Sequence, residues 1–197
     1  LRMAASSVAH LQPANLAPSS LPCVKWVSDV CAFIRSTRPV HIEIDLTKQQ
    51  LKLWQESRVL MDVTVSTGAN GIGEINGSGC TPRGAHIVRA MIGAGAPVNA
   101  VFVQRRWTKE LWTPELHQQF PRRDWMLTRI LWLSGTEPGK NRLGCVDTFR
   151  RYIYLHGTPA ITELGKPGSK GCVRMRNEDI IRLFDAVRVG IEVNLHE

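Results

Sequence analysis

Hydrophobic and polar residues alternate along much of the chain from residue 40 onward. Turn-forming residues, above all glycine, proline and asparagine, separate the alternating runs. The strand candidates are residues 41–45, 51–53, 59–65, 86–91, 101–103, 130–133, 151–155 and 191–195. Many short runs of period two with turn signals between them predict a mainly β fold, either a mixed sandwich or a barrel-like sheet.

Two segments in this part of the chain are not strand-like. Residues 177–187 repeat apolar side chains every three to four positions, with Asn177 as the expected cap and Gly190 as the expected stop. Within residues 107–125, Thr113 is followed by proline, which is typical of a helix start. We therefore predict a helical lid insertion there and a longer helix near the C-terminus.

The first 39 residues differ in composition from the rest. Residues 4–20 are rich in Ala, Ser and Pro and are predicted to form an arm, and residues 23–36 have a helical period. A chain of 197 residues accommodates one domain and a short arm. We predict an N-terminal arm with a short helix over residues 1–39 and one folded domain over residues 40–197.

Charge is distributed unevenly. Residues 105–176 hold 14 Lys and Arg against 6 Asp and Glu, which accounts for the whole net charge of +8. Such a field suits an anionic substrate with several carboxylates, although a solvated basic face is the alternative. Tryptophans lie among these cations, but they more often anchor a core or lid, and no nucleic-acid-binding fingerprint is present.

Several function classes and compartments are disfavoured. No serine-hydrolase, phosphate-loop or metalloprotease motif occurs, so we expect no cofactor and no metal. No run approaches the roughly 20 apolar residues needed to cross a bilayer. Five cysteines without a CxxC pair favour a reducing compartment, and no secretory leader is visible. We expect a cytoplasmic protein, with a periplasmic or wall location as the alternative if a leader was removed ahead of Leu1.

A histidine and a cysteine carry the candidate chemistry. His156 closes a strand-like run, and Cys172 follows a glycine-bearing loop just before the predicted C-terminal helix. A thiol becomes a nucleophile when a nearby base or positive charge favours the thiolate. Either residue alone is more often structural, the cysteine packing in a core and the histidine capping a strand. Together, flanked by glycines, they predict a catalytic pair.

The run HGTPAITELGKPGSKGCVRM, residues 156–175, resembles the signature of the L,D-transpeptidase (YkuD-domain) family. Residues 50–54 resemble the family's first hairpin, and residues 65–68 and 81–84 resemble two of its turns. The similarity covers roughly residues 40–195 and is specific at the His and Cys motif. It implies the family's mixed β catalytic fold and a cysteine peptidase or acyltransferase of peptidoglycan.

The resemblance implies roles for four catalytic residues. Cys172 would form a thioester with a tetrapeptide stem at the bond between the diamino acid and D-Ala. His156 would accept or relay the thiol proton, and Ser169 would orient a ring nitrogen or donate a hydrogen bond. Backbone N–H groups near Gly171 and Cys172 could hold the oxyanion, each such donor being worth about 3 kcal/mol of barrier.

Four further residues are candidates for substrate binding. Arg174 would bind a substrate carboxylate or brace the loop, and Tyr154 and Thr158 flank His156. Lys170 stands where the family has a second histidine. This departure places a fixed positive charge two residues from the thiol, which should favour the thiolate.

The acyl-enzyme has two possible fates. Water would make the protein an L,D-carboxypeptidase of wall recycling, and an amine from a second stem would give a 3–3 cross-link by L,D-transpeptidation. We favour hydrolysis of soluble stem peptides or muropeptides. A nonenzymatic wall-fragment binder is a further alternative, in which Lys170 marks a lost activity. The oligomeric state and the diamino acid preferred are left open.

Overall fold

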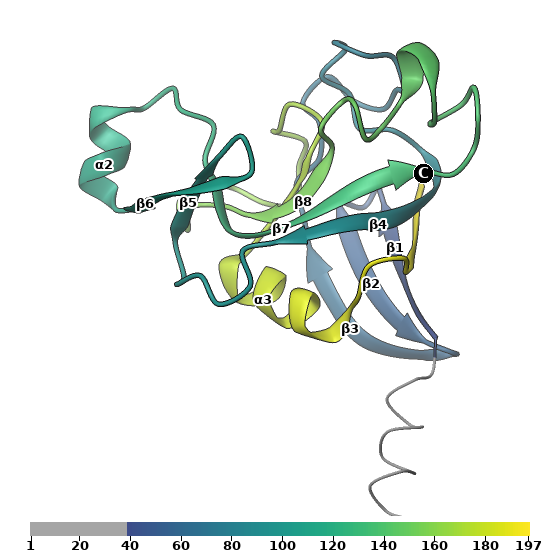
Figure 1. Ribbon diagram of the computed structural model, residues 1–197, viewed down its shortest axis with the longest axis horizontal. Helices are drawn as coiled ribbons and strands as arrows, with labels where there is room; N and C mark the ends of the chain where they lie inside the picture. The colour runs from purple at the N-terminus through teal and green to yellow at the C-terminus, as the bar shows by residue number, and fades with distance from the viewer. Residues whose placement is uncertain (1–38) are drawn as a thin grey trace, which may run out of the picture. The chain divides into compact units, whose positions relative to one another are not determined.

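A curled sheet of ten strands dominates the computed structural model, which describes residues 39–197 (Figure 1). The strands are β1 (Val40–Asp45), β2 (Gln50–Gln55), β3 (Arg58–Thr64), β4 (Gly84–Ile92), β5 (Ala100–Val103), β6 (Arg106–Leu111), β7 (Met126–Gly135), β8 (Tyr154–Gly157), β9 (Val173–Met175) and β10 (Glu192–His196). Their order is β3-β2-β1-β10-β4-β7-β5-β6, with β8 paired to β7 and β9 paired to β8. The mainly β class predicted from the alternation is confirmed.

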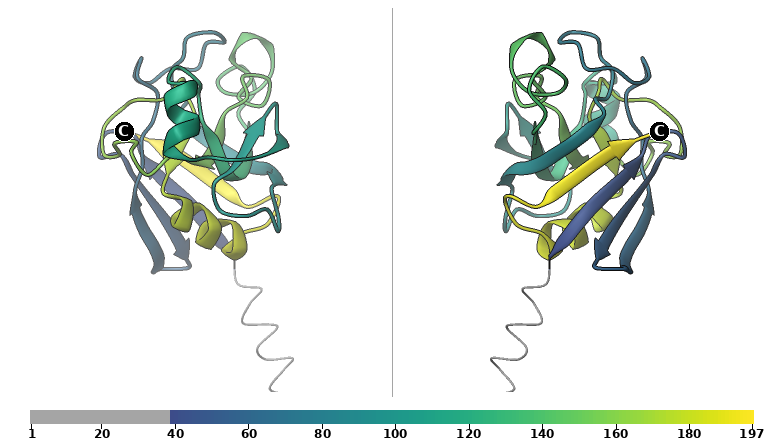
Figure 2. Two further views of the ribbon diagram at one scale, coloured as in Figure 1. Left: turned by 90° about the vertical axis from the view of Figure 1, so that its left-hand side faces the viewer. Right: turned by 90° about the vertical axis from the view of Figure 1, so that its right-hand side faces the viewer.

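The last strand joins the two halves of the sheet. β10 lies between β1 and β4, parallel to β1 and antiparallel to β4, as the side views show (Figure 2). Without β10, the β1–β3 ribbon would share no strand pairing with the β4–β7 half that carries β8. The C-terminal residues are therefore part of the scaffold beneath the candidate site.

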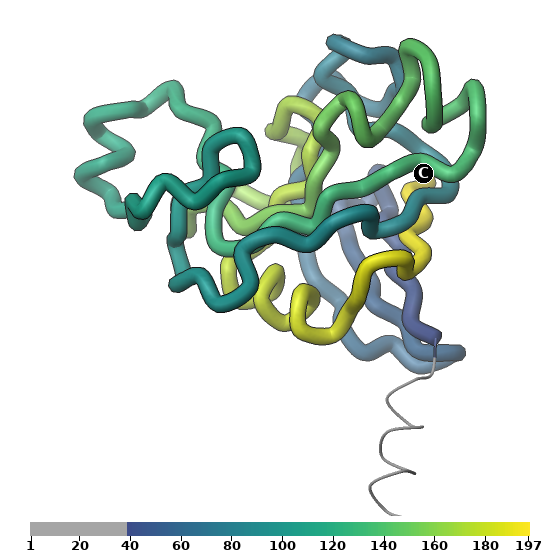
Figure 3. The backbone as a smooth tube through the Cα atoms, in the orientation of Figure 1, coloured from purple at the N-terminus to yellow at the C-terminus, as the bar shows by residue number. Residues whose placement is uncertain are grey.

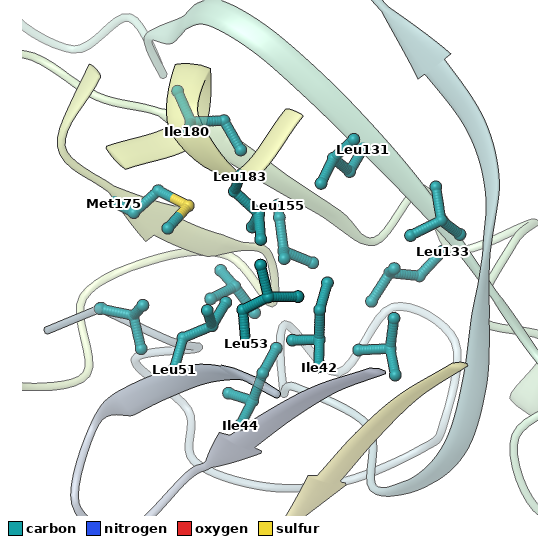
Figure 4. Packing of buried hydrophobic residues seen from close by; sticks show 14 of the residues in the cluster. Ile42, Ile44, Leu51, Leu53, Leu131, Leu133, Leu155, Met175, Ile180 and Leu183 are labelled. Atoms are coloured by element: carbon teal, nitrogen blue, oxygen red, sulfur yellow. The ribbon is translucent and has the colours of Figure 1, made fainter. Parts of the chain in front are cut away.

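The core fills the hollow of the curled sheet (Figure 4). Alternation along β1 points Ile42 and Ile44 inward, and both are fully buried. Side chains from β2, β7, β8, β9 and the C-terminal helix meet them there: Leu51, Leu53, Leu131, Leu133, Leu155, Met175, Ile180 and Leu183. Each such side chain contributes about 1.5–3 kcal/mol by leaving water. The strands that carry the candidate site thus pack on a closely packed hydrophobic core.

Helix α3 (Asn177–Ala186) packs against β7 and β8 through Ile180 and Leu183. The expectation that Asn177 caps it is wrong. Arg176 occupies the cap position, and Asn177 is the first helical residue. The expected stop at Gly190 is also wrong, because the helix ends at Ala186 and the glycine forms the turn into β10.

The region predicted as a helical insertion is only partly helical. Its first third is strand β6, which pairs with β5 across a bulge, and the helix α2 is limited to Pro114–Gln119. The hydroxyl of Thr113 accepts a hydrogen bond from the N–H of Leu116, as a helix cap should. This excursion projects from the body of the sheet, while the β5–β6 turn reaches back toward β8 (Figure 3).

The predicted strand at residues 151–155 is shifted. β8 begins at Tyr154, because Tyr152 adopts a positive φ of 59° in the preceding turn. β9, only three residues long, was not predicted. The predicted helix at residues 23–36 lies outside the described residues, and the domain boundary at residue 40 stays a prediction. Within the described part of the chain, no helix is long and apolar enough to span a membrane.

Candidate active site

Strands β8 and β9 place the predicted histidine and cysteine on one face of the sheet. They pair in parallel, with His156 opposite Arg174. Cys172 lies two residues before Arg174, so alternation puts both on the face that His156 shares with Tyr154. Val173, between them, is buried in the core on the opposite face. The sheet therefore brings together two residues that lie sixteen positions apart in sequence.

His156 is buried and held in one tautomer. Its Nδ1 lies 2.8 Å from the carbonyl oxygen of Gly157, which can only accept, so Nδ1 carries the proton. Burial lowers the pKa of His156 to about 4, so the ring is neutral at pH 7. The unprotonated Nε2 is consequently the basic atom of this side chain.

Cys172 is a thiol in the resting protein. Its Sγ donates to the carbonyl of Tyr152 at 3.4 Å. The side chain keeps some exposure, yet the packed surroundings of the sulfur raise the pKa of the Cys172 thiol to about 12. Because the thiolate is not formed in advance, attack by sulfur requires a base that takes the proton. The neutral imidazole of His156 is a base of that kind.

An ion pair lies beside both groups. Arg174 Nη2 contacts Asp124 Oδ1 at 2.7 Å, and Arg174 Nη1 donates to the carbonyl of Gly168 at 2.8 Å. The charge of Asp124 raises the pKa of both Cys172 and His156, and the charge of Arg174 lowers it, each less than burial does. Arg174 thus braces the loop that leads to the cysteine, one of the two roles expected of it.

The loop before Cys172 is fixed by short polar contacts. Ser169 Oγ donates to the carbonyl of Cys172 at 2.5 Å and accepts from the N–H of Gly171 at 3.1 Å. The hydroxyl of Thr81 donates to the carbonyl of Gly171 at 2.9 Å. Ser169 therefore shapes the turn and contacts no ring nitrogen of His156. The N–H of Gly171 is engaged in this turn, and the oxyanion contact expected of the N–H groups near Gly171 and Cys172 stays a prediction.

The loop conformation at residue 171 requires glycine. Its φ is +112°, a conformation that residues with a Cβ rarely adopt. A Cβ there would lie 2.9 Å from the carbonyl oxygen of Cys80 and 3.1 Å from Ile153 Cδ1. The backbones of Gly171 and Cys80 thus approach each other too closely for a side chain at residue 171.

Two clefts are lined by neighbours of Cys172, one by Tyr152, whose carbonyl the sulfur contacts, and the other by Lys170 and Arg174 on the segment of Cys172 itself. The first, of about 480 Å³, we call the Arg105 cleft, and it is lined by Gln104, Arg105, Met126, Tyr152 and Tyr154. The second, of about 230 Å³, we call the Lys170 cleft, and its lining includes Arg122, Arg123, Asp124, Thr158, Lys170 and Arg174. The four predicted substrate-binding residues are therefore divided, with Tyr154 in the first cleft and the other three in the second.

Comparison with known proteins decides the family. The sequence profile of the L,D-transpeptidase catalytic domain, YkuD, matches residues 39–195. The chain belongs to the YkuD family of L,D-transpeptidase catalytic domains.

Curated YkuD-family relatives match this chain over part of their length. The probable L,D-transpeptidase YbiS of Escherichia coli K12 is 32% identical over 106 residues, which are 52% of this chain and 33% of the relative. The putative L,D-transpeptidase YkuD of Bacillus subtilis is 38% identical over 47 residues, 24% of this chain and 29% of the relative. The chain spans about a third of the length of the curated relatives it matches.

A solved structure shares the fold of this YkuD domain. Bd1075 of Bdellovibrio bacteriovorus superposes with a TM-score of 0.51 at 15% identity, over 83% of this chain and 49% of that one. At this identity the likeness concerns the arrangement of strands and helices only. It agrees with the mixed β catalytic fold that the sequence resemblance implied.

Lys170, the departure from the YkuD pattern, is expected to favour the thiolate, and this effect stays a prediction. Its side chain is exposed, and Arg174 and Arg151 are the cations that lower the pKa of Cys172 most. Water screens a charge on an exposed side chain, and burial of the sulfur outweighs all the cations together. Lys170 lines the Lys170 cleft together with Arg122, Arg123 and Arg174.

Three residues of this YkuD domain were missed from sequence. Asp124 lies in the segment predicted as a lid and Arg105 lies just before that segment, and no motif marks either of them. Arg151 was counted only as part of the basic segment. It donates to the carbonyls of Glu74 and Cys80 at 2.7 and 2.6 Å and so ties a glycine-rich loop to the turn that precedes β8. Only the folded chain brings these side chains to the site.

Proposed function

We propose that this YkuD domain forms a thioester between Cys172 and a peptidoglycan tetrapeptide stem and then hydrolyses it. The observation that carries the proposal is the pairing of a protonated thiol with a neutral imidazole on one face of β8 and β9. The family supplies the substrate class, because its members act as L,D-transpeptidases. The domain would thus be a peptidoglycan-acting cysteine enzyme.

The chemistry follows from the protonation states. As the sulfur of Cys172 attacks the carbonyl of the third residue, a diamino acid, its proton passes to Nε2 of His156. The bond from that carbonyl to the nitrogen of D-Ala then breaks, and the imidazolium returns the proton to the departing amine. Proton donation from Nδ1 to the carbonyl of Gly157 holds the ring in the tautomer that this exchange requires.

Water as the second substrate is favoured by the charge at the cleft. An acceptor amine is cationic at neutral pH, and Lys170 in the lining of the Lys170 cleft would repel it. Water carries no net charge, so the positive charge of Lys170 does not repel it. The domain would then act as an L,D-carboxypeptidase that trims tetrapeptide to tripeptide.

The place of action we propose is a reducing interior. Cys80 and Cys145 are unpaired like Cys172, and Cys145 is exposed. Unpaired exposed thiols are better tolerated where disulfides do not form. A cytoplasmic role in recycling soluble wall fragments fits both the unpaired thiols and the hydrolysis of the thioester.

Product analysis tests the proposal. Wild-type protein incubated with a tetrapeptide stem should give tripeptide and free D-Ala with little dimer. Lys170→His should raise the ratio of dimer to tripeptide. Lys166→His is the matched control, since Lys166 is an exposed lysine paired with Glu163 outside both clefts and should leave the ratio unchanged. If 3–3 dimers dominate with the wild type, cross-linking is the main reaction and our proposal for water is wrong.

A further inference from the structure

The turn between β5 and β6 carries an arginine whose backbone is held in a strained conformation. Gln104 and Arg105 have φ values of 48° and 67°, both in the left-handed region. A two-residue hairpin turn needs this geometry at both positions and usually recruits asparagine and glycine for it. Gln104 and Arg105 instead carry long side chains at a conformational cost, which points to a role for one of them.

Aromatic residues beneath the turn hold the side chain of Arg105. Its guanidinium carbon lies 4.7 Å from the ring centroid of Trp132 and 5.0 Å from that of Tyr152. Trp132 in turn stacks on Phe149 at 3.9 Å. Cations attract aromatic faces in this arrangement, so the guanidinium is fixed in position before any ligand arrives.

The charge of Arg105 is not neutralised. Within residues 39–197, no carboxylate forms an ion pair with it, whereas Arg123 pairs with Glu110 and Arg174 pairs with Asp124. Its polar partner is the hydroxyl of Tyr154, which accepts from Nη1 at 3.1 Å. An arginine guanidinium has five N–H donors, so several remain for a ligand in the Arg105 cleft.

Tyr154 adds a second donor at the same place. Burial raises the pKa of its phenol, so the hydroxyl keeps its proton at neutral pH. The hydroxyl accepts from Arg105 and still has an O–H to donate. A guanidinium and a neutral hydroxyl side by side are the donor set that binds a carboxylate.

The Arg105 cleft lies directly beside the nucleophile. Cys172 packs against the cluster that contains Tyr154 and Trp132, and its Sγ contacts the carbonyl of Tyr152, which also lines the cleft. A carboxylate bound at Arg105 would therefore belong to the part of the substrate nearest the bond that is cut. The Lys170 cleft holds several cations and is suited to the more distant carboxylates of a stem.

Resting on the proposed function, we infer that Arg105 and the Tyr154 hydroxyl form a subsite for the terminal carboxylate of the departing D-residue. That carboxylate is separated from the scissile carbonyl by only one nitrogen and one α-carbon. The guanidinium can hold it through two parallel hydrogen bonds, which a lysine could not do. Arg105 would thereby select stems that end in a free D-residue at position four.

Paired substrates test this subsite. One tetrapeptide stem ends in a free D-Ala carboxylate and the other in the D-Ala amide, and kcat/KM for tripeptide release is compared between them. Wild type should prefer the acid by about 10- to 100-fold, the range typical of one charge-assisted hydrogen bond. Arg105→Gln should abolish this preference by slowing the acid alone. Arg106→Gln, at the next and exposed position of the hairpin, should retain it.

Two controls keep the outcomes distinct. Alkylation of Cys172 by neutral iodoacetamide should proceed at the wild-type rate in Arg105→Gln, which shows an intact site, and Arg105→Lys should recover part of the acid preference. If Arg105→Gln keeps the acid preference, the proposed subsite is wrong. The proposed function still holds in that case, provided that the thioester forms. Absence of a thioester with either stem would overturn the proposed function and this inference with it.

Discussion

Asp124 and Arg174 form an ion pair of 2.7 Å between a lid residue and strand β9. Both side chains are largely buried, with 25% and 16% of their surface exposed. The pair lies beside the candidate nucleophile and the candidate base, and its two charges act on them in opposite directions. The segment predicted as a lid therefore contributes to the electrostatics of the site.

Neutralising Asp124 and neutralising Arg174 should shift the pKa of the Cys172 thiol in opposite directions. Asp124→Asn removes a charge that raises the pKa of Cys172, so iodoacetamide at pH 7.5 should alkylate Cys172 several-fold faster. Arg174→Gln removes a charge that lowers this pKa and should slow the reaction. Peptide mapping of the alkylated protein measures both rates. Glu110→Gln, which breaks the Arg123 pair, is the control and should change neither; equal rates in all variants would contradict the arrangement.

Replacing the base should remove most of the activity. His156→Ala should lower kcat/KM for the tetrapeptide stem by about 10²- to 10⁴-fold with an unchanged circular dichroism spectrum. His41→Ala, on β1, serves as the control. A loss below about fivefold would assign His156 to packing alone.

The pH profile follows from the same buried ring. Because burial lowers the pKa of His156 to about 4, the ring stays unprotonated through the range where an ordinary histidine titrates. Activity should hold from neutral pH down to about pH 5 and fall as pH approaches 4, since protonation removes the base. A profile of kcat/KM with its acid limb near pH 6.5 would show that His156 is solvated and only weakly perturbed.

Alternation and local signals predicted most of the scaffold. Ile42, Ile44, Leu51 and Leu53 are buried as the period of two requires, and Thr113 caps a helix as predicted. Strands β6 and β9 were missed for a physical reason. β6 has no fully buried residue and β9 is only three residues long. Neither strand therefore has an alternation of apolar and polar residues from which a strand can be predicted.

The site was only partly predictable. His156 and Cys172 stand in a motif, and the alternation of β8 and β9 places them together. Asn177 looked like a cap, yet its amide bonds to Thr128 and Asn99 at 2.8 and 2.7 Å in the folded chain. Such pairings join residues from 49 to 78 positions apart, which no local pattern reports.

Adding a methyl group at Gly171 should damage the site specifically. Gly171→Ala puts a Cβ 2.9 Å from the carbonyl of Cys80 in addition to the strain of a positive φ, so stem cleavage should fall at least tenfold and the melting temperature should drop. Gly71→Ala is the matched control, because Gly71 also has a positive φ but has open space around its Cβ position. Equal losses in the two variants would mean that strain alone, and not the contact with Cys80, matters.

Salt should weaken substrate binding. Arg105, Arg122 and Lys170 line the two clefts without an ion-pair partner among residues 39–197, and a stem peptide carries several carboxylates. Exposed charges are screened over a Debye length of about 10 Å at 0.1 M salt. KM for the stem should rise steadily between about 0.05 and 0.5 M ionic strength. A constant KM would leave the basic segment as a solvated face.

Trapping the acyl-enzyme tests the central claim most directly. The chain is mixed with a tetrapeptide stem, quenched in acid within the first turnover and examined by intact mass and peptide mapping. We predict an adduct with the mass of the stem less D-Ala, located on Cys172, absent from Cys172→Ala and retained in Cys145→Ala. A wild-type chain that releases tripeptide without ever carrying this adduct, or that carries it on another residue, would contradict the account.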